Sequence, residues 1–421
     1  MAEVSPDELP ALEAQVARRP QDSDLLYRYA AGLFSADQCD SAVTVAARAA
    51  QYDPSNAIGP LIAGPCLEQN GYYEDAIALY ARFAAAYPRT NGLSAIRARE
   101  LLARRAGATQ SAREAIARES ELTAQDPNPQ VIAVLPLAVS GDSAYQPLSR
   151  GLAQMIMSDL ALLRTFRLVE RLQIGALLEE LQLSASERVN PQTAARVGHL
   201  ISAGRMVQGL ANIPDEQNVR LEASVVLSTG EVTAPHAVNG PFRNLIQMEK
   251  ELVTVLAFQL GYRLSEAERQ LILENGTGNL AAFLAYSRGL EAQELGDYSA
   301  AATHFGNAVQ ADPSFQEARS RQEASASAPA VQQASPGQVT TLAAGPSSSR
   351  EPALESVSGA VQGALGDLAA THTERTTESA GETVNIVTRT TSNSTASEPP
   401  PPDFTPTGPV VTTIRIIFRL P

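Results

Sequence analysis

The sequence predicts an α+β protein of several domains, in which paired-helix repeats flank an α/β domain with a mixed sheet and a disordered tail follows. Three observations support this fold class. Small residues, aromatic residues and a closing proline recur in three 34-residue segments, two of them consecutive and the third beyond a central stretch. Within that stretch, β-branched runs alternate with helical patterns. From residue 324 the composition turns to Ala, Ser, Thr, Gln, Pro and Gly.

The first domain, residues 1–125, contains two copies of the repeat in residues 23–56 and 57–90. A third copy, with a helix expected to cap it, lies in residues 278–323. We align the copies on their closing prolines, Pro54, Pro88 and Pro313. The positions that then coincide are Ala30, Gly64 and Gly289; Ala42, Ala76 and Ala301; Gly71 and Gly296; Tyr73 and Tyr298; and Tyr80 and Phe305.

Each copy is expected to form two antiparallel helices, which approach closely only where small side chains separate them. Gly71 and Gly296 would supply the turn, and the residue before each proline would leave the helical region. The pattern resembles the tetratricopeptide repeat. That resemblance implies that a peptide or helix of a partner protein binds on the repeat face. Because an isolated repeat is marginally stable, the third copy is expected to stack on another element.

Residues 129–273 are predicted to form an α/β domain with the element order β-α-β-α-α-β-β-α. The first strand is a continuous apolar run, as expected for a buried strand. Asn190 is expected to cap the helix that begins at Pro191, and residues 214–218 to form a hairpin loop. The expected strands are residues 131–137, 167–170, 204–213 and 219–227, and the other expected helices are residues 148–163, 172–183 and 242–260.

The order of motifs in this domain resembles the CsgG-like domain of the curli-secretion lipoprotein family and its envelope relatives. The motifs are IAVLPL at residues 132–137, VER at 169–171 and a small-residue turn into a strand at 203–209. The resemblance implies a role in cell-envelope assembly. The family's channel consists of long insertions that span the membrane as hairpins, whereas the strands here are joined by a few residues. Pore formation is therefore not expected.

Charge and hydropathy limit the partners. The net charge of −14 disfavours nucleic acid, because phosphate binding needs clustered Lys and Arg. No apolar run is long enough for a transmembrane segment, and residues 1–22 lack the pattern of a signal peptide. The protein is expected to be periplasmic or outer-membrane-associated if an export signal is missing from this sequence, and cytoplasmic otherwise. Lys250 is the only lysine, which we attribute to coding bias.

Few residues are candidates for chemistry. Cys39 and Cys66 lie in adjacent repeats at helix ends that adjoin. Two buried free thiols are the preferred interpretation, and a disulfide bond is the alternative. Gly141, Asp142 and Ser143 follow the first strand and are the best candidate for a small-ligand loop, although a plain loop is preferred.

No metal or cofactor site is expected, because the histidines are scattered over unrelated segments. These are His199, His236, His304 and His372. No nucleophile, phosphate-loop or dinucleotide motif stands in a strand–turn–helix setting. Catalytic residues cannot be nominated, and the protein is not expected to be an enzyme.

Residues 324–409 are predicted to be a disordered linker. Residues 410–421 are predicted to form a strand that completes this protein's own sheet, adds to an edge on a partner, or stays unpaired. The sequence thus favours a non-enzymatic bacterial cell-envelope scaffold or assembly protein that binds partner proteins. The alternative is a cytoplasmic repeat adaptor whose middle domain binds a small ligand or regulates an enzyme. The oligomeric state is left open.

Overall fold

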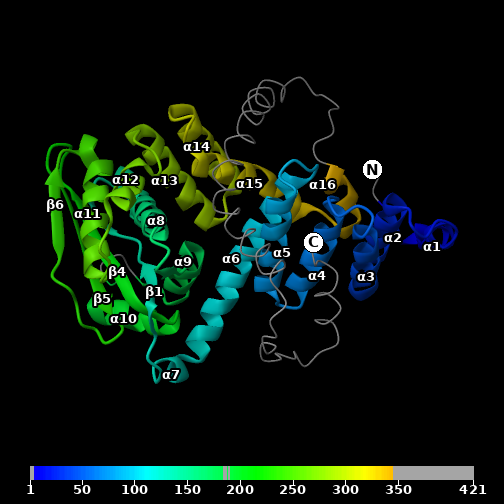
Figure 1. The fold of residues 1–421 in the computed structure, drawn as a ribbon, viewed down its shortest axis with the longest axis horizontal. Coiled ribbons are helices and arrows are strands. Elements are labelled where there is room, and N and C mark those ends of the chain that lie inside the picture. The colour runs from blue at the N-terminus through cyan, green and yellow to red at the C-terminus, as the bar shows by residue number, and fades with distance from the viewer. Residues whose placement is uncertain (1–3, 184–186, 188–189, 345–421) are drawn as a thin grey trace, which may run out of the picture. The chain divides into compact units, whose positions relative to one another are not determined.

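The computed structural model is mainly helical around one mixed sheet (Figure 1). The residues that it describes are 4–183, 187 and 190–344. They form two compact units, the first made of residues 4–103 with residues 330–344, and the second of the described residues between 104 and 329. The boundaries between the units fall inside the helices α6 (Leu93–Ala117) and α15 (Gln316–Gln333).

The first unit consists of antiparallel helical hairpins. The helices α2 and α3 form the first hairpin, α4 and α5 form the second, and the start of α6 follows them. The elements of this unit, besides the parts of α6 and α15, are η1 (Pro6–Glu8), α1 (Leu9–Arg18), α2 (Ser23–Ser35), α3 (Cys39–Ala50), α4 (Ile58–Gln69), α5 (Tyr73–Ala86), η5 (Pro336–Gln338) and α16 (Val339–Ala344).

Paired helices approach most closely at the aligned small residues. A β-carbon on Gly64 would lie 2.0 Å from the Tyr80 hydroxyl oxygen. In the third hairpin a β-carbon on Gly289 would lie 2.6 Å from the Phe305 ring. The first hairpin carries buried alanines, Ala30 and Ala46, at the corresponding two positions. In the second and third hairpins a glycine thus leaves space for an aromatic ring of the paired helix. In the first hairpin alanine replaces both the glycine and the aromatic residue.

The turn inside each hairpin contains a residue with a left-handed backbone conformation, at the same position in the alignment of the three copies. Gly71 has a φ of 76° and Gly296 a φ of 80°. The corresponding residue of the first hairpin is Asp37, with a φ of 58°, a conformation that aspartate tolerates better than most residues. These are the positions at which the sequence predicted the turns. The buried alanines Ala42, Ala76 and Ala301 also take equivalent places. The assignment to the tetratricopeptide family stays a prediction.

The second unit contains the α/β domain and the third helical hairpin, α13 with α14. Its elements, besides the parts of α6 and α15, are α7 (Glu119–Leu122), β1 (Asn128–Val134), β2 (Ala138–Gly141), η2 (Ser143–Tyr145), α8 (Leu148–Ala161), β3 (Arg167–Leu168), α9 (Arg171–Glu180), α10 (Pro191–Leu200), β4 (Ala203–Ile213), β5 (Val219–Leu227), β6 (His236–Gly240), η4 (Phe242–Asn244), α11 (Leu245–Gln259), α12 (Glu266–Glu274), α13 (Leu280–Leu295) and α14 (Tyr298–Ala311).

The sheet has the order β3-β1-β4-β5-β6, with β2 paired to the far end of β4. β1 runs parallel to β3 and β4, whereas β5 runs antiparallel to both of its neighbours, β4 and β6. The predicted mixed sheet and the β4–β5 hairpin are therefore confirmed. The run expected as one strand, residues 131–137, ends as β1 at Val134, and β2 follows Pro136, which has no amide hydrogen for the ladder.

Helices cover both faces of the sheet (Figure 1). On one face, α8 and α11 pack with Ile132, Val207 and Val225. On the other face, α9 and α10 pack with Val131, Ala133 and Met206. The side chain of Asn190 caps α10 by accepting a hydrogen bond from the Gln192 amide, as predicted.

Several expectations are wrong in detail. Gly141 ends β2 and does not lie in a loop. The strand β6 and the helix α12 were not expected. Structure was expected to end near residue 324, yet α15 continues to Gln333, because alanines favour the helix and Ala328 and Val331 are buried. Residues 410–421 lie outside the described residues. Among the described residues, no helix is long and apolar enough to span a membrane.

Candidate protein-docking surfaces

A cavity of about 370 Å³ lies on one face of the first unit. Its walls come from the two hairpins and the start of α6, and they include Tyr73, one of the aligned aromatic residues. The lining residues from these elements are Phe34, Leu61, Pro65, Glu68, Gln69, Tyr73 and Arg99. Glu68 accepts hydrogen bonds from the Tyr80 hydroxyl at 2.7 Å and from Arg99 Nη2 at 2.8 Å. The wall is thus mainly apolar, with one charged pair and the polar groups of Gln69 and Tyr73.

The rest of the wall is supplied by residues 331–344, which we call the docked segment. Within it, η5 packs against α2, and α16 packs against α4 and α2. Figure 1 labels α16. The Val4 amide donates a hydrogen bond to the Gly337 carbonyl at 3.4 Å. A β-carbon on Gly92 would lie 2.7 Å from the Ala343 carbonyl oxygen. The face on which the sequence predicted a partner peptide is therefore in contact with a segment of the same chain.

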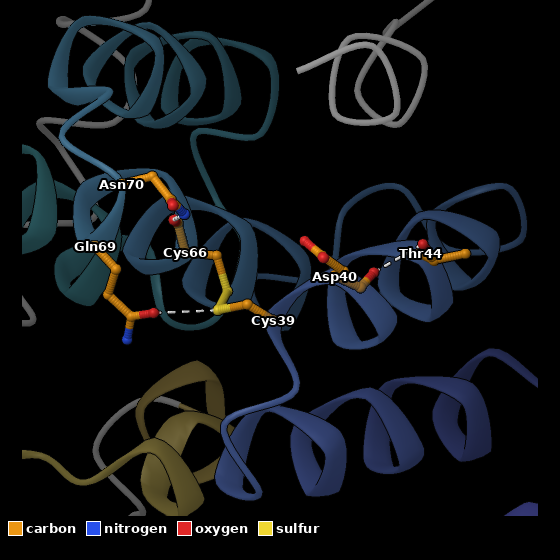
Figure 2. The surroundings of a disulfide bond; sticks show 6 residues. All are labelled: Cys39, Asp40, Thr44, Cys66, Gln69 and Asn70. Atoms are coloured by element: carbon orange, nitrogen blue, oxygen red, sulfur yellow. Dashed lines mark hydrogen bonds between the residues drawn. A yellow bond between two sulfur atoms is a disulfide. The ribbon is translucent and has the colours of Figure 1, made fainter. Parts of the chain in front are cut away.

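A disulfide bond joins Cys39 at the start of α3 to Cys66 in α4 (Figure 2). The Cα atoms are 5.7 Å apart, and the side-chain amide of Gln69 lies 3.3 Å from the Cys39 sulfur. The preferred interpretation of two free thiols is wrong. Because α3 and α4 run antiparallel in successive hairpins, the beginning of one helix lies beside the end of the other. The bond therefore links the first hairpin to the second.

The third hairpin packs on the α/β domain through α8 and α13. A β-carbon on Gly151 of α8 would lie 2.0 Å from Ser287 Oγ and 3.2 Å from the Phe283 ring. Ser287 is fully buried and donates its hydroxyl hydrogen to the Phe283 carbonyl. The expectation that this hairpin stacks on another element is confirmed, and its support is the first long helix of the α/β domain.

The VER motif, residues 169–171, connects the sheet to the flanking helices through ion pairs. Arg171 is 5% exposed and donates to Glu294 of α13. The preceding Glu170 pairs with Arg104 of α6. Arg150 of α8 donates to Glu294 as well, and reaches Glu291 at 3.0 Å. The motif thus fixes both flanking helices to the edge of the α/β domain.

The only lysine of the chain lies in a buried carboxylate cluster between α8 and α11. Lys250 Nζ lies 2.9 Å and 2.7 Å from the two carboxylate oxygens of Asp159, and 3.0 Å from the Asn275 carbonyl oxygen. Glu249 is fully buried, 3.7 Å from Lys250 Nζ, and its oxygens have no hydrogen-bond partner among the described residues. Burial raises the pKa of Glu249 well above its usual range, and the Asp159 carboxylate adds to this effect. The cluster fixes the segment before α13 to the core.

The polar groups of the candidate ligand loop form hydrogen bonds with the backbone of the loop and of the neighbouring strand. The Asp142 carboxylate accepts a hydrogen bond from the Ala144 amide at 2.8 Å and so caps η2, while Gly141 pairs with Ile213 in the sheet. Gly141, Asp142 and Ser143 therefore have a local structural role. His199 lies 3.1 Å from the Ser228 carbonyl, and His372 lies outside the described residues. Within the described part of the chain, no group of three or more His, Cys, Asp or Glu residues could hold a metal ion.

Several of the principal features here escaped sequence reasoning. The docked segment was assigned to the linker, although the Ser-Pro pair at 335–336 followed by apolar residues is a helix-start signal. Gly151 was not singled out, because a helical glycine indicates a close contact only when its neighbour is known. Arg171 was noted only as part of a motif, and its partner Glu294 lies too far along the chain to be inferred.

The family model described as "Curli production assembly/transport component CsgG" matches residues 128–221. The match begins at β1 and ends inside β5, so it covers the parallel part of the sheet with α8, α9 and α10. No curated protein matches the sequence. The resemblance of the middle domain is confirmed over these residues, which are less than half of the chain. The protein therefore contains a CsgG-like domain, flanked by helical hairpins.

Proposed function

We propose that this protein is a non-enzymatic scaffold or assembly component of the bacterial cell envelope that binds partner proteins. The observation that carries the proposal is the match of residues 128–221 to a family of curli assembly and transport components. The helical hairpins supply a second type of surface, one that suits a peptide or helix of a partner. The proposal takes over the assembly role of the family and leaves out its channel, because β4 and β5 are joined by the short loop of residues 214–218.

The disulfide supports an envelope location. Structural disulfides form and persist in oxidising compartments, including the bacterial periplasm, and are rare in the cytosol. The bond joins Cys39 and Cys66, which are 27 positions apart. We infer that the protein works in the periplasm or at the outer membrane.

The hairpins support the binding role. In the tetratricopeptide interpretation, the small residues Gly64 and Gly289 are required because each lies against an aromatic ring. Such positions set the helix crossing and thus the shape of the inner face. We extend the proposal to residues 410–421, whose alternating apolar pattern suits addition to a sheet edge. β6 is one of the two terminal strands of the described sheet, the longer one, and is the candidate edge on this chain.

Cell fractionation tests the proposal. The gene is expressed with a C-terminal tag in its bacterial host, and periplasm, membranes and cytoplasm are separated. We expect the protein with the envelope fractions. Recovery wholly in the cytoplasm would favour the alternative, a repeat adaptor with a ligand-binding middle domain. A thermal-shift screen separates the two further, since a metabolite that binds the folded state raises the melting temperature.

A further inference from the structure

The docked segment (residues 331–344) does not fill all the space between itself and the hairpins of the first unit. The remaining cavity of about 370 Å³ lies within the range of roughly 300–1,000 Å³ that is typical of ligand pockets. Phe34, Leu61 and Pro65 are among the residues that line it. A ligand with a larger apolar side chain would fill this space and bury more apolar surface than the docked segment does.

The docked segment also has few stabilising interactions within itself. The described part of its helix α16 is Val339–Ala344, and isolated helices shorter than about 12–15 residues are marginal in water. The helical state of this segment depends on the contacts with α2 and α4. Detachment of the docked segment therefore breaks few hydrogen bonds inside the segment. Its replacement on α2 and α4 by another segment costs little free energy of this kind.

The docked segment shows which chemistry the hairpins recognise. Ser335 forms a capping box with Gln338, and Pro336 takes the first helical position, so the backbone is prepared for a helical turn. Val339 and Ala343 are buried four positions apart, while Thr341 between them is exposed. Val339 and the half-buried Leu342 line the cavity. The recognised element is a Ser-Pro helix start followed by apolar residues on one face.

We propose that residues 331–344 are an internal ligand of the first unit, and that a partner segment with the same Ser-Pro helix start and a larger apolar side chain displaces them. The larger side chain enters the cavity at the place of Val339. The inference rests on the proposed protein-binding role of the hairpins, and it adds the chemistry of the partner and the competition that regulates its access.

A fluorescent peptide with the sequence of residues 331–344 tests this on the full-length protein. Binding is measured by fluorescence anisotropy for the wild type, for Val339→Asp and for Thr341→Asp. Val339→Asp places a charge on the buried face and detaches the segment, so its affinity for the peptide rises at least tenfold. Thr341→Asp adds the same charge on the exposed face and is the matched control, with the affinity of the wild type.

A peptide carrying Val339→Phe provides an independent readout, because the ring fills the cavity. It is expected to bind the Val339→Asp protein at least fivefold more tightly than the unmodified peptide. Equal affinities for all three proteins, including no binding to any, would overturn the proposal. So would loss of helical circular dichroism in Val339→Asp, because the segment would then be an essential part of the fold. Cell fractionation, which tests the envelope role, is independent of these outcomes.

Discussion

Gly151 and Ser287 place the third helical hairpin directly on the CsgG-like domain, since a β-carbon on Gly151 would lie 2.0 Å from Ser287 Oγ. The two residues come from α8 and α13, which are distant in sequence and packed without space for a methyl group. The hairpin is therefore a structural part of this unit, and it does not need a second repeat as its neighbour.

Substitution of Gly151 by alanine should destabilise the protein. Overpacking at a tight helix contact costs about 1–3 kcal/mol, which outweighs the gain of up to about 1 kcal/mol from replacing a helical glycine. The free energy of unfolding, measured by urea denaturation, should fall by about 1–2 kcal/mol. Adding Ser287→Gly should recover most of the loss.

Gly175 provides the control, because a β-carbon there would have its nearest contact at 3.5 Å. Gly175→Ala in α9 should leave stability unchanged or raise it by up to about 1 kcal/mol. Equal effects of Gly151→Ala and Gly175→Ala would show that α8 and α13 are not closely packed.

The Arg171–Glu294 ion pair should contribute far more than a surface pair. Removing one partner of a buried pair costs about 3–5 kcal/mol, because the other charge stays buried, and Glu294 retains Arg150, which reduces the loss. Arg171→Ala is expected to lower the free energy of unfolding by about 2–4 kcal/mol. The exposed pair Arg196–Glu119 is the comparison, and Arg196→Ala should cost less than about 1 kcal/mol. Chemical denaturation of both variants measures the difference, and similar losses would contradict the role assigned to Arg171.

Glu249→Gln should stabilise the protein at neutral pH. Burial raises the pKa of Glu249, so the folded state retains a proton that the unfolded chain releases above the ordinary pKa of glutamate. The contribution of Glu249 to the free energy of unfolding is therefore fully present below the ordinary pKa of glutamate. It is lost as the pH rises toward the pKa of Glu249 in the folded state. Glutamine stays neutral and removes this loss. We expect the free energy of unfolding of Glu249→Gln at pH 7.5 to be higher than that of the wild type.

The measurement is the free energy of unfolding as a function of pH between 5 and 8, and the slope should be shallower in Glu249→Gln than in the wild type. Glu251 lies on the exposed side of the same helix, and Glu251→Gln should stay within about 0.5 kcal/mol of the wild type. An unchanged slope in Glu249→Gln would mean that Glu249 is ionised in the fold.

Reduction of the disulfide should lower the stability of the first unit. Closing a loop of this length stabilises a protein by about 3–4 kcal/mol in the chain-entropy model, and the residues between Cys39 and Cys66 belong to two hairpins. The midpoint of thermal unfolding should fall when a reductant is added. A variant with Cys39→Ser and Cys66→Ser should start at the lower midpoint and show no response to reductant. A reductant effect of equal size in that variant would contradict this explanation.

Local patterns were sufficient to predict much of the fold. The helix that became α8, the cap at Asn190 and the β4–β5 hairpin all follow from spacing and short-range signals. The hairpin turns were predicted from Gly71 and Gly296, and Asp37 shows that the register persists where the glycine is absent. These features depend on residues that are close in sequence.

The remaining features depend on contacts between distant residues. β6 is short and becomes a strand by pairing with β5. The helical turn of the docked segment forms against α2 and α4, and its composition alone resembles a linker. Lys250 had no distinguishing pattern around it, and its partner Asp159 is on another helix. Neither local propensity nor periodicity identifies such pairs.

The central claim, that this protein works in the cell envelope, is tested most directly by the redox state of Cys39 and Cys66 in growing cells. Intact cells are quenched with acid, and free thiols are labelled with a maleimide polymer that shifts the protein on a gel. We predict no shift unless the sample is first reduced, because the two cysteines are joined in an oxidising compartment. A shift at both cysteines without reduction would place the protein in a reducing compartment and contradict the claim.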